Sequence, residues 1–239
     1  MNTKKLWASS NRLRAIPWKS LPAWLAGNRL RILMYHSISE NPHDPYAVSP
    51  AEFKRQMHLL QEDYVISLQE GLQRLRENQP LNKSWVITFD DSLLDFYTTA
   101  LPILREFGYA ASMFVPTALV GKNAIWNSYD KTKPLMTWVQ LEECQRWNIT
   151  FGSHATNHAR LTECNDDILM DELQTSLYIL QKRLVHIFPA LAYPGGYHNA
   201  RVREAARASG YICALGASSR WGNGYESDLF QLRRERFNQ

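Results

Sequence analysis

Short apolar runs alternate with amphipathic stretches from about residue 31 onward. Most of these runs are continuously apolar, which is typical of parallel strands with helices over both faces of the sheet. We expect strands at residues 31–36, 64–67, 85–90, 111–116, 148–152, 190–194, 211–216 and 230–236. The amphipathic stretches predict helices at 50–60, 93–107, 138–147, 166–185 and 200–209. The alternation predicts an α/β fold, a single distorted (β/α) barrel of seven or eight strands.

Length and composition agree with one globular domain. The chain has 239 residues, of which 45% are hydrophobic and 21% charged, enough to bury a core. The longest stretch free of Asp, Glu, Lys and Arg, residues 184–200, contains two prolines and two glycines and cannot span a membrane as a helix. The three cysteines form no CxxC pair, which argues against a disulfide framework and against a cysteine zinc site.

The first 30 residues differ in composition from the rest, and we treat them as a separate basic segment before a barrel at 31–239. Residues 1–31 hold seven Lys or Arg and no acid, together with Trp7, Trp18 and Trp24. This mixture suits an anionic bilayer surface, although a packed or poorly ordered arm is an alternative. No apolar run of signal-peptide length is present. We therefore expect a cytoplasmic protein, with peripheral contact to the inner face of a bacterial plasma membrane through residues 1–28.

Polar residues follow several of the predicted strands. His36 ends the first strand, Asp90 and Asp91 end the third, and His154 and His158 follow the fifth. In a β/α barrel these carboxyl ends meet at one face, where functional residues collect.

The spacing of His154 and His158 allows both imidazoles to face one point. With a carboxylate they would complete a set suited to catalytic zinc, although the same ligands also fit iron oxygenases. Adjacent residues at a strand end point in different directions, so one of Asp90 and Asp91 can bind a metal while the other reaches a water molecule. A strand-end loop with two solvated acids, or a helix cap, is the alternative.

Three segments in this order carry a family resemblance: VITFDDS at 86–92, GSHATNHARL at 152–161 and AYPGG at 192–196. They resemble the principal motifs of the polysaccharide deacetylase family, also called carbohydrate esterase family 4 or the NodB-like domain. The early YHSI at 35–38 resembles the branch that includes poly-N-acetylglucosamine deacetylases. The similarity extends from about Ile32 to Arg234.

The resemblance implies roles for several residues. Asp91, His154 and His158 would hold one divalent metal ion, expected to be zinc, with cobalt, manganese or nickel as alternatives. Asp90 would be the general base that deprotonates the attacking water. His36 would be the general acid, since the family's late LxLH motif is absent. Arg234 would orient the base, with Arg233 or Arg236 as alternatives.

The resemblance also implies contacts with the substrate. A backbone N–H near Gly195 would stabilise the oxyanion, and Gly195, Tyr193 and Trp138 would bind substrate. The family's TFDDG is TFDDS here, so Ser92 implies a position that does not require the conformational freedom of glycine.

We therefore expect a metal-dependent hydrolase that removes N-acetyl groups from an amino sugar. The substrate would be a bacterial cell-envelope or surface glycan, or its lipid-linked precursor. One alternative is a non-catalytic glycan-binding or scaffold protein on the same barrel. Another is a different metal enzyme with the same ligands, such as a deformylase or an oxygenase. No nucleic-acid partner is expected.

Overall fold

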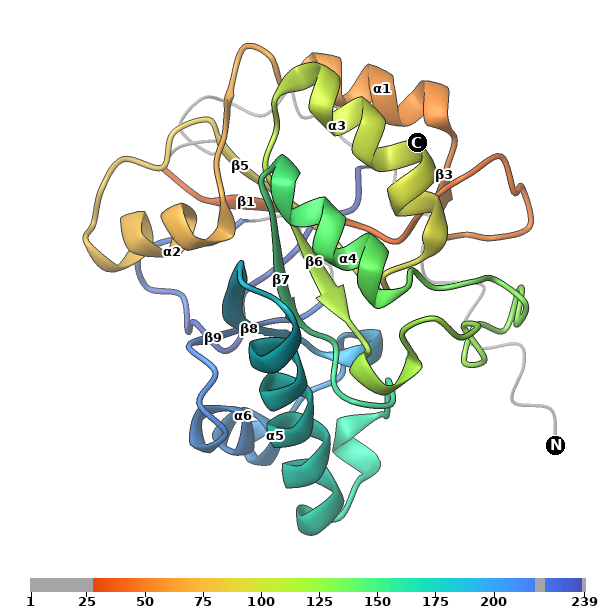
Figure 1. Cartoon of the computed structure of the whole chain (residues 1–239). Coiled ribbons are helices and arrows are strands. Elements are labelled where there is room, and N and C mark those ends of the chain that lie inside the picture. The colour runs from red at the N-terminus through yellow and green to blue at the C-terminus, as the bar shows by residue number, and fades with distance from the viewer. Residues whose placement is uncertain (1–27, 218–221, 238–239) are drawn as a thin grey trace, which may run out of the picture.

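The computed structural model describes residues 28–217 and 222–237 (Figure 1). The predicted N-terminal segment therefore lies almost entirely outside the described residues. Seven parallel strands form the main sheet, in the order β1–β5–β6–β7–β8–β9, with β4 also paired to β5. These strands are β1 (Arg31–Tyr35), β4 (Tyr64–Val65), β5 (Ser84–Phe89), β6 (Ala111–Val115), β7 (Ile149–Ser153), β8 (Ile187–Ala192) and β9 (Cys213–Leu215).

The C-terminal segment connects the two ends of this sheet. Leu232 forms a parallel bridge to Leu215 of β9, and Glu235 forms one to Leu33 of β1. Backbone hydrogen bonds accompany both bridges, including Leu232 N–H to Ala214 O at 3.0 Å. The pairings return from β9 to β1, so the predicted distorted barrel is confirmed, and the eighth predicted strand is an irregular segment.

Both faces of the strands are buried, which explains the continuously apolar runs. Every residue of β5 is buried. Trp85, Ile87 and Phe89 pack in the cluster beneath the helices, whereas Val86 packs with the side chains of the barrel interior. Gly152 of β7 leaves room in that interior, because a Cβ there would lie 2.6 Å from the ring of Phe114.

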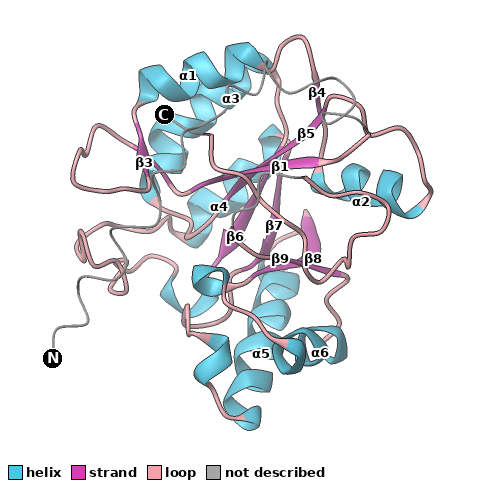
Figure 2. Ribbon diagram, turned by 180° about the vertical axis from the view of Figure 1, so that it is seen from behind, coloured by secondary structure: helices cyan, strands magenta, loops and turns pink. Residues whose placement is uncertain are grey.

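Helices surround the barrel in two main groups (Figures 1 and 2). Helices α1 (Pro50–Leu59) and α3 (Leu101–Phe107) pack side by side, and α5 (Asp166–Arg183) packs beside α6 (Ala200–Ala208) at the opposite end of the view. Helix α4 (Trp138–Cys144) lies between these groups. Across the described part of the chain, no helix combines the length and the apolar character needed to cross a bilayer.

Three local elements were not expected from the sequence. Helix α2 (Leu68–Arg76) begins after its N-cap Ser67, and its Gly71 lies so close to Leu30 that a Cβ would come within 2.8 Å. Strands β2 (Ser37–Ile38) and β3 (Ala47–Val48) form a small separate sheet. The predicted helix at 93–107 contains a π-helical turn at Phe96–Ala100 before α3.

Candidate active site and metal centre

Three polar side chains continue the inward-facing alternation of their strands past the strand ends. In β1, β5 and β7 every second side chain faces the interior, and His36, Asp90 and His154 occupy the next inward positions. Because parallel strands end at the same edge, these side chains meet at one mouth of the barrel. They line a cavity of about 240 Å³ there.

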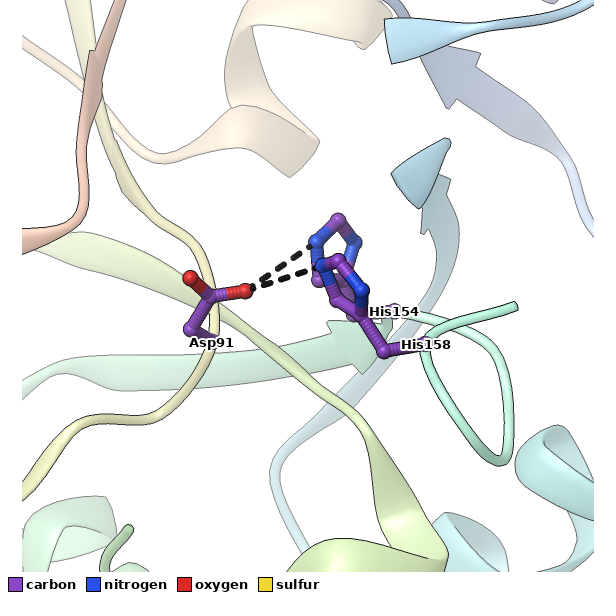
Figure 3. A group of neighbouring side chains, drawn as sticks. All are labelled: Asp91, His154 and His158. Carbon is purple, nitrogen blue, oxygen red and sulfur yellow. Dashed lines mark ion pairs between the residues drawn. The ribbon is translucent and has the colours of Figure 1, made fainter. Parts of the chain in front are cut away.

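Asp91, His154 and His158 point toward one another at this mouth (Figure 3). Asp91 Oδ1 lies 3.4 Å from His154 Nε2 and 3.3 Å from His158 Nε2. One ligand atom from each residue lies within 4.8 Å of the other two. The two imidazole rings are inclined by 73°, with centroids 4.8 Å apart. The three predicted ligands therefore form one compact group.

The hydrogen bonding of this group fits a divalent metal ion. Asp91 Oδ1 is buried and accepts no hydrogen bond, although two imidazole nitrogens lie within 3.4 Å. His154 Nδ1 lies 2.8 Å from the carbonyl oxygen of Ala192; a carbonyl only accepts, so Nδ1 carries the proton and Nε2 is available as a ligand. Two imidazole nitrogens and a carboxylate oxygen are a set that zinc prefers at catalytic sites. These three residues would hold the metal.

The backbone around the ligands is left-handed at several non-glycine residues. The φ angles of Asp91, Ser92 and His158 are 72°, 53° and 55°. Such a conformation costs an L-residue about 1–2 kcal/mol, so the surrounding structure must hold it in place. The expectation that Ser92 avoids a glycine-like conformation is therefore wrong. Its hydroxyl is also buried without a hydrogen-bond partner.

Arg234 holds Asp90 in place, and the family resemblance implied this contact. Two nitrogens of Arg234 donate to the two carboxylate oxygens of Asp90, each at 2.7 Å, and Arg234 Nε donates to Gly216 O at 2.8 Å. Burial alone would raise the pKa of Asp90, but the charge and hydrogen bonds of Arg234, together with the charges of His154 and His36, outweigh it, and this pKa lies below its ordinary value. Of the two alternatives, Arg233 is exposed and Arg236 makes no ion pair with Asp90.

His36 lies beside Asp90 in the wall of the same cavity. Its Nε2 is 3.9 Å from Asp90 Oδ2, and its ring packs on Tyr46 with centroids 4.8 Å apart. Burial lowers the pKa of His36, and the nearby carboxylates of Asp90 and Asp91 oppose this shift only in part. The side chain is 18% exposed, so it is open to the cavity.

Gly195 and Gly196 form part of the cavity wall after β8. Their φ angles are 65° and 76°, which favour glycine. A Cβ on Gly196 would lie 2.3 Å from that of Ala217, and one on Gly195 would lie 2.9 Å from the ring of Tyr197. The two glycines therefore allow the backbone itself to face the cavity.

Aromatic side chains from two loops form the outer wall of the cavity, and no periodic signal in the sequence identified them. Trp126 stacks on His158, with ring centroids 4.3 Å apart and planes inclined by 14°. Tyr46 and Tyr129 come from different loops, and their ring centroids lie 6.4 Å apart. The guanidinium of Arg236 lies 4.3 Å above the ring of Tyr46. All five of these side chains line the cavity.

A buried lysine connects the two aromatic loops. Lys133 Nζ donates to Asp44 Oδ2 at 2.8 Å and to Ser37 Oγ at 2.6 Å. Asp95 Oδ2 lies 3.7 Å from the same nitrogen. Lys133 is 9% exposed and Asp44 4%. This ion pair joins the loop that carries Tyr46 to the loop that carries Trp126 and Tyr129.

The structure does not bring Tyr193 and Trp138 to the cavity, which corrects the expectation that they bind substrate. Tyr193 is fully buried, and its hydroxyl donates to Phe230 O at 3.0 Å. Trp138 begins α4, where Arg183 lies 5.5 Å from its ring. Of the three predicted substrate contacts, Gly195 is the one that lines the cavity.

Comparison with known proteins gives consistent matches. A family model described as polysaccharide deacetylase matches residues 77–214. YxkH of Bacillus subtilis, assigned by its name to the polysaccharide deacetylases, is 27% identical over 224 residues, covering 90% of this chain and 74% of its own length. The poly-beta-1,6-N-acetyl-D-glucosamine N-deacetylase of Staphylococcus aureus is 24% identical over 183 residues, covering 72% of this chain and 61% of that enzyme.

Solved structures match most of the chain. The deacetylase PplD of Streptococcus pyogenes, in complex with acetate, has a TM-score of 0.76 and 28% identity over 88% of this chain and 93% of its own. IcaB from Ammonifex degensii has a TM-score of 0.77 over 89% and 93% of the two chains. At 20% identity, that second likeness supports the fold alone.

Proposed function

Because the chain belongs to the polysaccharide deacetylase family, we propose that it is a divalent-metal hydrolase that removes N-acetyl groups from an amino sugar. One observation carries this proposal. The Asp91, His154 and His158 group lies beside the Asp90–Arg234 pair in one cavity. Three protein ligands for a divalent metal, beside an ionised carboxylate that can act as a base, suit metal-assisted hydrolysis of an amide.

When bound, the metal would polarise the acetamide carbonyl and make a water molecule more acidic. Asp90 takes a proton from the attacking water, and Arg234 keeps its carboxylate ionised and fixed in orientation. The backbone N–H of Gly195 donates to the oxyanion of the tetrahedral intermediate. His36, whose Nε2 lies 3.9 Å from Asp90 Oδ2, receives the proton that Asp90 has taken and gives it to the leaving nitrogen. The products are acetate and a free amine on the sugar.

The aromatic wall supports a sugar substrate. Trp126, Tyr46 and Tyr129 line the cavity, and pyranose rings offer apolar faces that pack on aromatic side chains. Among relatives, the Staphylococcus aureus enzyme is named for poly-beta-1,6-N-acetyl-D-glucosamine, and PplD was solved with acetate, the product expected here. We propose a bacterial cell-envelope or surface glycan, or its lipid-linked precursor, as the substrate.

Acetate release from defined oligosaccharides tests the reaction. The full chain is loaded with zinc, cobalt, manganese or nickel and offered β-1,6-linked and β-1,4-linked N-acetylglucosamine oligomers. We expect acetate from at least one oligomer in the wild type, none from Asp90→Asn or Asp91→Asn, and normal rates from Asp171→Asn, an exposed carboxylate of α5. Metal binding without acetate from any oligomer would instead support a non-catalytic glycan-binding protein.

We also propose that the reaction takes place at the cytoplasmic membrane face. The support is the basic, tryptophan-bearing composition of residues 1–28. The full chain should sediment with vesicles containing anionic phospholipid, and a Trp7→Ser, Trp18→Ser, Trp24→Ser variant should sediment markedly less. Equal sedimentation of the two proteins would remove the membrane part of the proposal.

A further inference from the structure

Glu172 is a buried carboxylate of α5 that stands outside the cavity. The residue is 4% exposed and does not line the cavity. A buried acid needs partners that compensate for its lost hydration. In the described part of the chain its side-chain partners lie in one short segment, between His154 and His158.

Glu172 forms hydrogen bonds with two residues of that segment, Thr156 and Asn157. Oε2 accepts the backbone N–H of Thr156 at 2.9 Å and that of Asn157 at 2.8 Å. Oε1 accepts from Asn157 Nδ2 at 2.7 Å. The hydroxyl of Thr156 donates back to the carbonyl oxygen of Glu172 at 3.0 Å. One residue of α5 thus makes four hydrogen bonds to the loop that carries two metal ligands.

The next turn of α5 holds the start of the same loop. The hydroxyl of Ser176 donates to Ala155 O at 3.1 Å and lies 2.8 Å from Ser153 Oγ. Ser153 Oγ in turn accepts the N–H of Ala155 at 3.0 Å. Residues four apart share a helix face, so Glu172 and Ser176 form one docking edge for the segment between β7 and His158.

The loop needs such support because its backbone is unfavourable. Ala155 and His158 have φ angles of 61° and 55°, in the region that favours glycine. Consecutive backbone N–H groups at Thr156 and Asn157 point the same way, and a charged carboxylate is a stronger acceptor for them than a neutral group. Without that acceptor, the N–H groups of Thr156 and Asn157 would favour another loop conformation, and we expect His158 to move relative to His154.

We propose that Glu172 is a positioning residue that sets the spacing of His154 and His158 for the metal ion. This inference rests on the proposed metal-dependent function. Glu172 does not ligate the metal; its carboxylate is already used by three N–H donors. Groups that orient metal ligands typically change metal affinity by about 10–100-fold when removed.

Zinc affinity of the metal-free full chain tests the proposal. Competition with a chromogenic chelator measures the dissociation constant for zinc alone in wild type, Glu172→Leu, Glu172→Gln and the control Asp171→Asn. We expect about a tenfold or greater loss for Glu172→Leu, no change for Asp171→Asn, and partial recovery for Glu172→Gln, whose amide oxygen can still accept. Circular dichroism and the metal-free melting temperature show whether each variant is folded.

The outcomes separate a positioning role from a structural one. Wild-type zinc affinity in folded Glu172→Leu would overturn the proposal. If Glu172→Leu does not fold, Glu172→Gln and Thr156→Val decide, and wild-type affinity in both would overturn it. Absence of zinc binding by the wild-type chain would overturn the metal-dependent function itself, and the role of Glu172 with it.

Discussion

Arg234 donates to both carboxylate oxygens of Asp90 at 2.7 Å each, across 144 positions of sequence. Arg234 is 1% exposed and also donates to Gly216 O. The pair joins the irregular C-terminal segment, which completes the barrel, to the end of β5. The side chain that attaches this segment to β5 is therefore also the one that helps to keep Asp90, the proposed base, ionised.

Replacing Arg234 should change the pH dependence of catalysis. Burial raises the pKa of Asp90 and Arg234 lowers it, so a weaker partner leaves that pKa higher. Since the ionised carboxylate is the active form, the acid limb of the kcat/KM profile should move to higher pH in Arg234→Lys. The profile of Arg233→Lys, an exposed neighbour, should match wild type. An acid limb at the same pH in Arg234→Lys would show that Asp90 is not the group that titrates.

His36→Ala should separate amide hydrolysis from ester hydrolysis. An amine must be protonated as it leaves, whereas a phenolate can leave without a proton, so only the amide reaction needs the acid. We expect deacetylation of an amino sugar to fall by about 10²–10⁴ and hydrolysis of an aryl acetate to change by less than about tenfold. His198→Ala is the control, because that histidine does not line the cavity. Equal losses on both substrates would exclude His36 as the acid.

Ser92→Gly should stabilise the protein. Serine at φ 53° carries a strain of about 1–2 kcal/mol that glycine lacks, and its buried hydroxyl has no partner. Glycine adds about 0.5–1 kcal/mol of lost chain entropy, so a net gain of about 1 kcal/mol is expected. For a chain of this size that raises the melting temperature by about 2–4 °C. Ser209→Gly, at φ −79°, should give no gain, and an unchanged or lower melting temperature in Ser92→Gly would contradict the strain.

The barrel follows from local sequence, whereas the assignment of Asp91, His154 and His158 as metal ligands came from the resemblance of three motifs to a known family. Continuous apolar runs in β1, β5 and β7 showed strands buried on both faces, and their period of two places His36, Asp90 and His154 inside. The conformation of Ser92 did not follow, because the left-handed turn is fixed by packing around residue 92 and serine gives no sign of it.

The sequence did not predict the aromatic side chains of the cavity or the ion pair that joins their two loops. Tyr46, Trp126 and Tyr129 lie on loops without periodicity, and only tertiary contacts bring the two loops together. Lys133 and Asp44 are 89 positions apart, and nothing in the sequence distinguishes either residue from an ordinary charged residue of the surface. Tyr193 was expected to bind substrate because it lies in a motif at a strand end. Its side chain instead faces the core, where its hydroxyl donates to the carbonyl oxygen of Phe230.

Lys133→Met should destabilise the protein and weaken substrate binding. It leaves the buried carboxylate of Asp44 without its counterion, a change that costs about 3–5 kcal/mol in typical proteins. The two aromatic loops lose their connection, so KM should rise more than kcat falls. Denaturant unfolding and steady-state kinetics measure both effects, with exposed Lys131→Met as the control. The double variant Lys133→Met, Asp44→Asn should recover part of the stability, and a double variant no more stable than Lys133→Met would argue against a direct pair.

Removal of the metal should lower the melting temperature of the wild type, and this effect should depend on Asp91, His154 and His158. Zinc at about a thousand times its dissociation constant adds about 4 kcal/mol to the free energy of unfolding. At about 2–4 °C per kcal/mol, the melting temperature of wild type should rise by about 10 °C when zinc is added to the chelator-treated protein. Asp91→Asn loses the carboxylate that both imidazoles face, so its melting temperature should not respond to zinc. A zinc-dependent rise of the same size in Asp91→Asn would show that zinc stabilises the chain elsewhere, and the catalytic proposal would then need a different metal site.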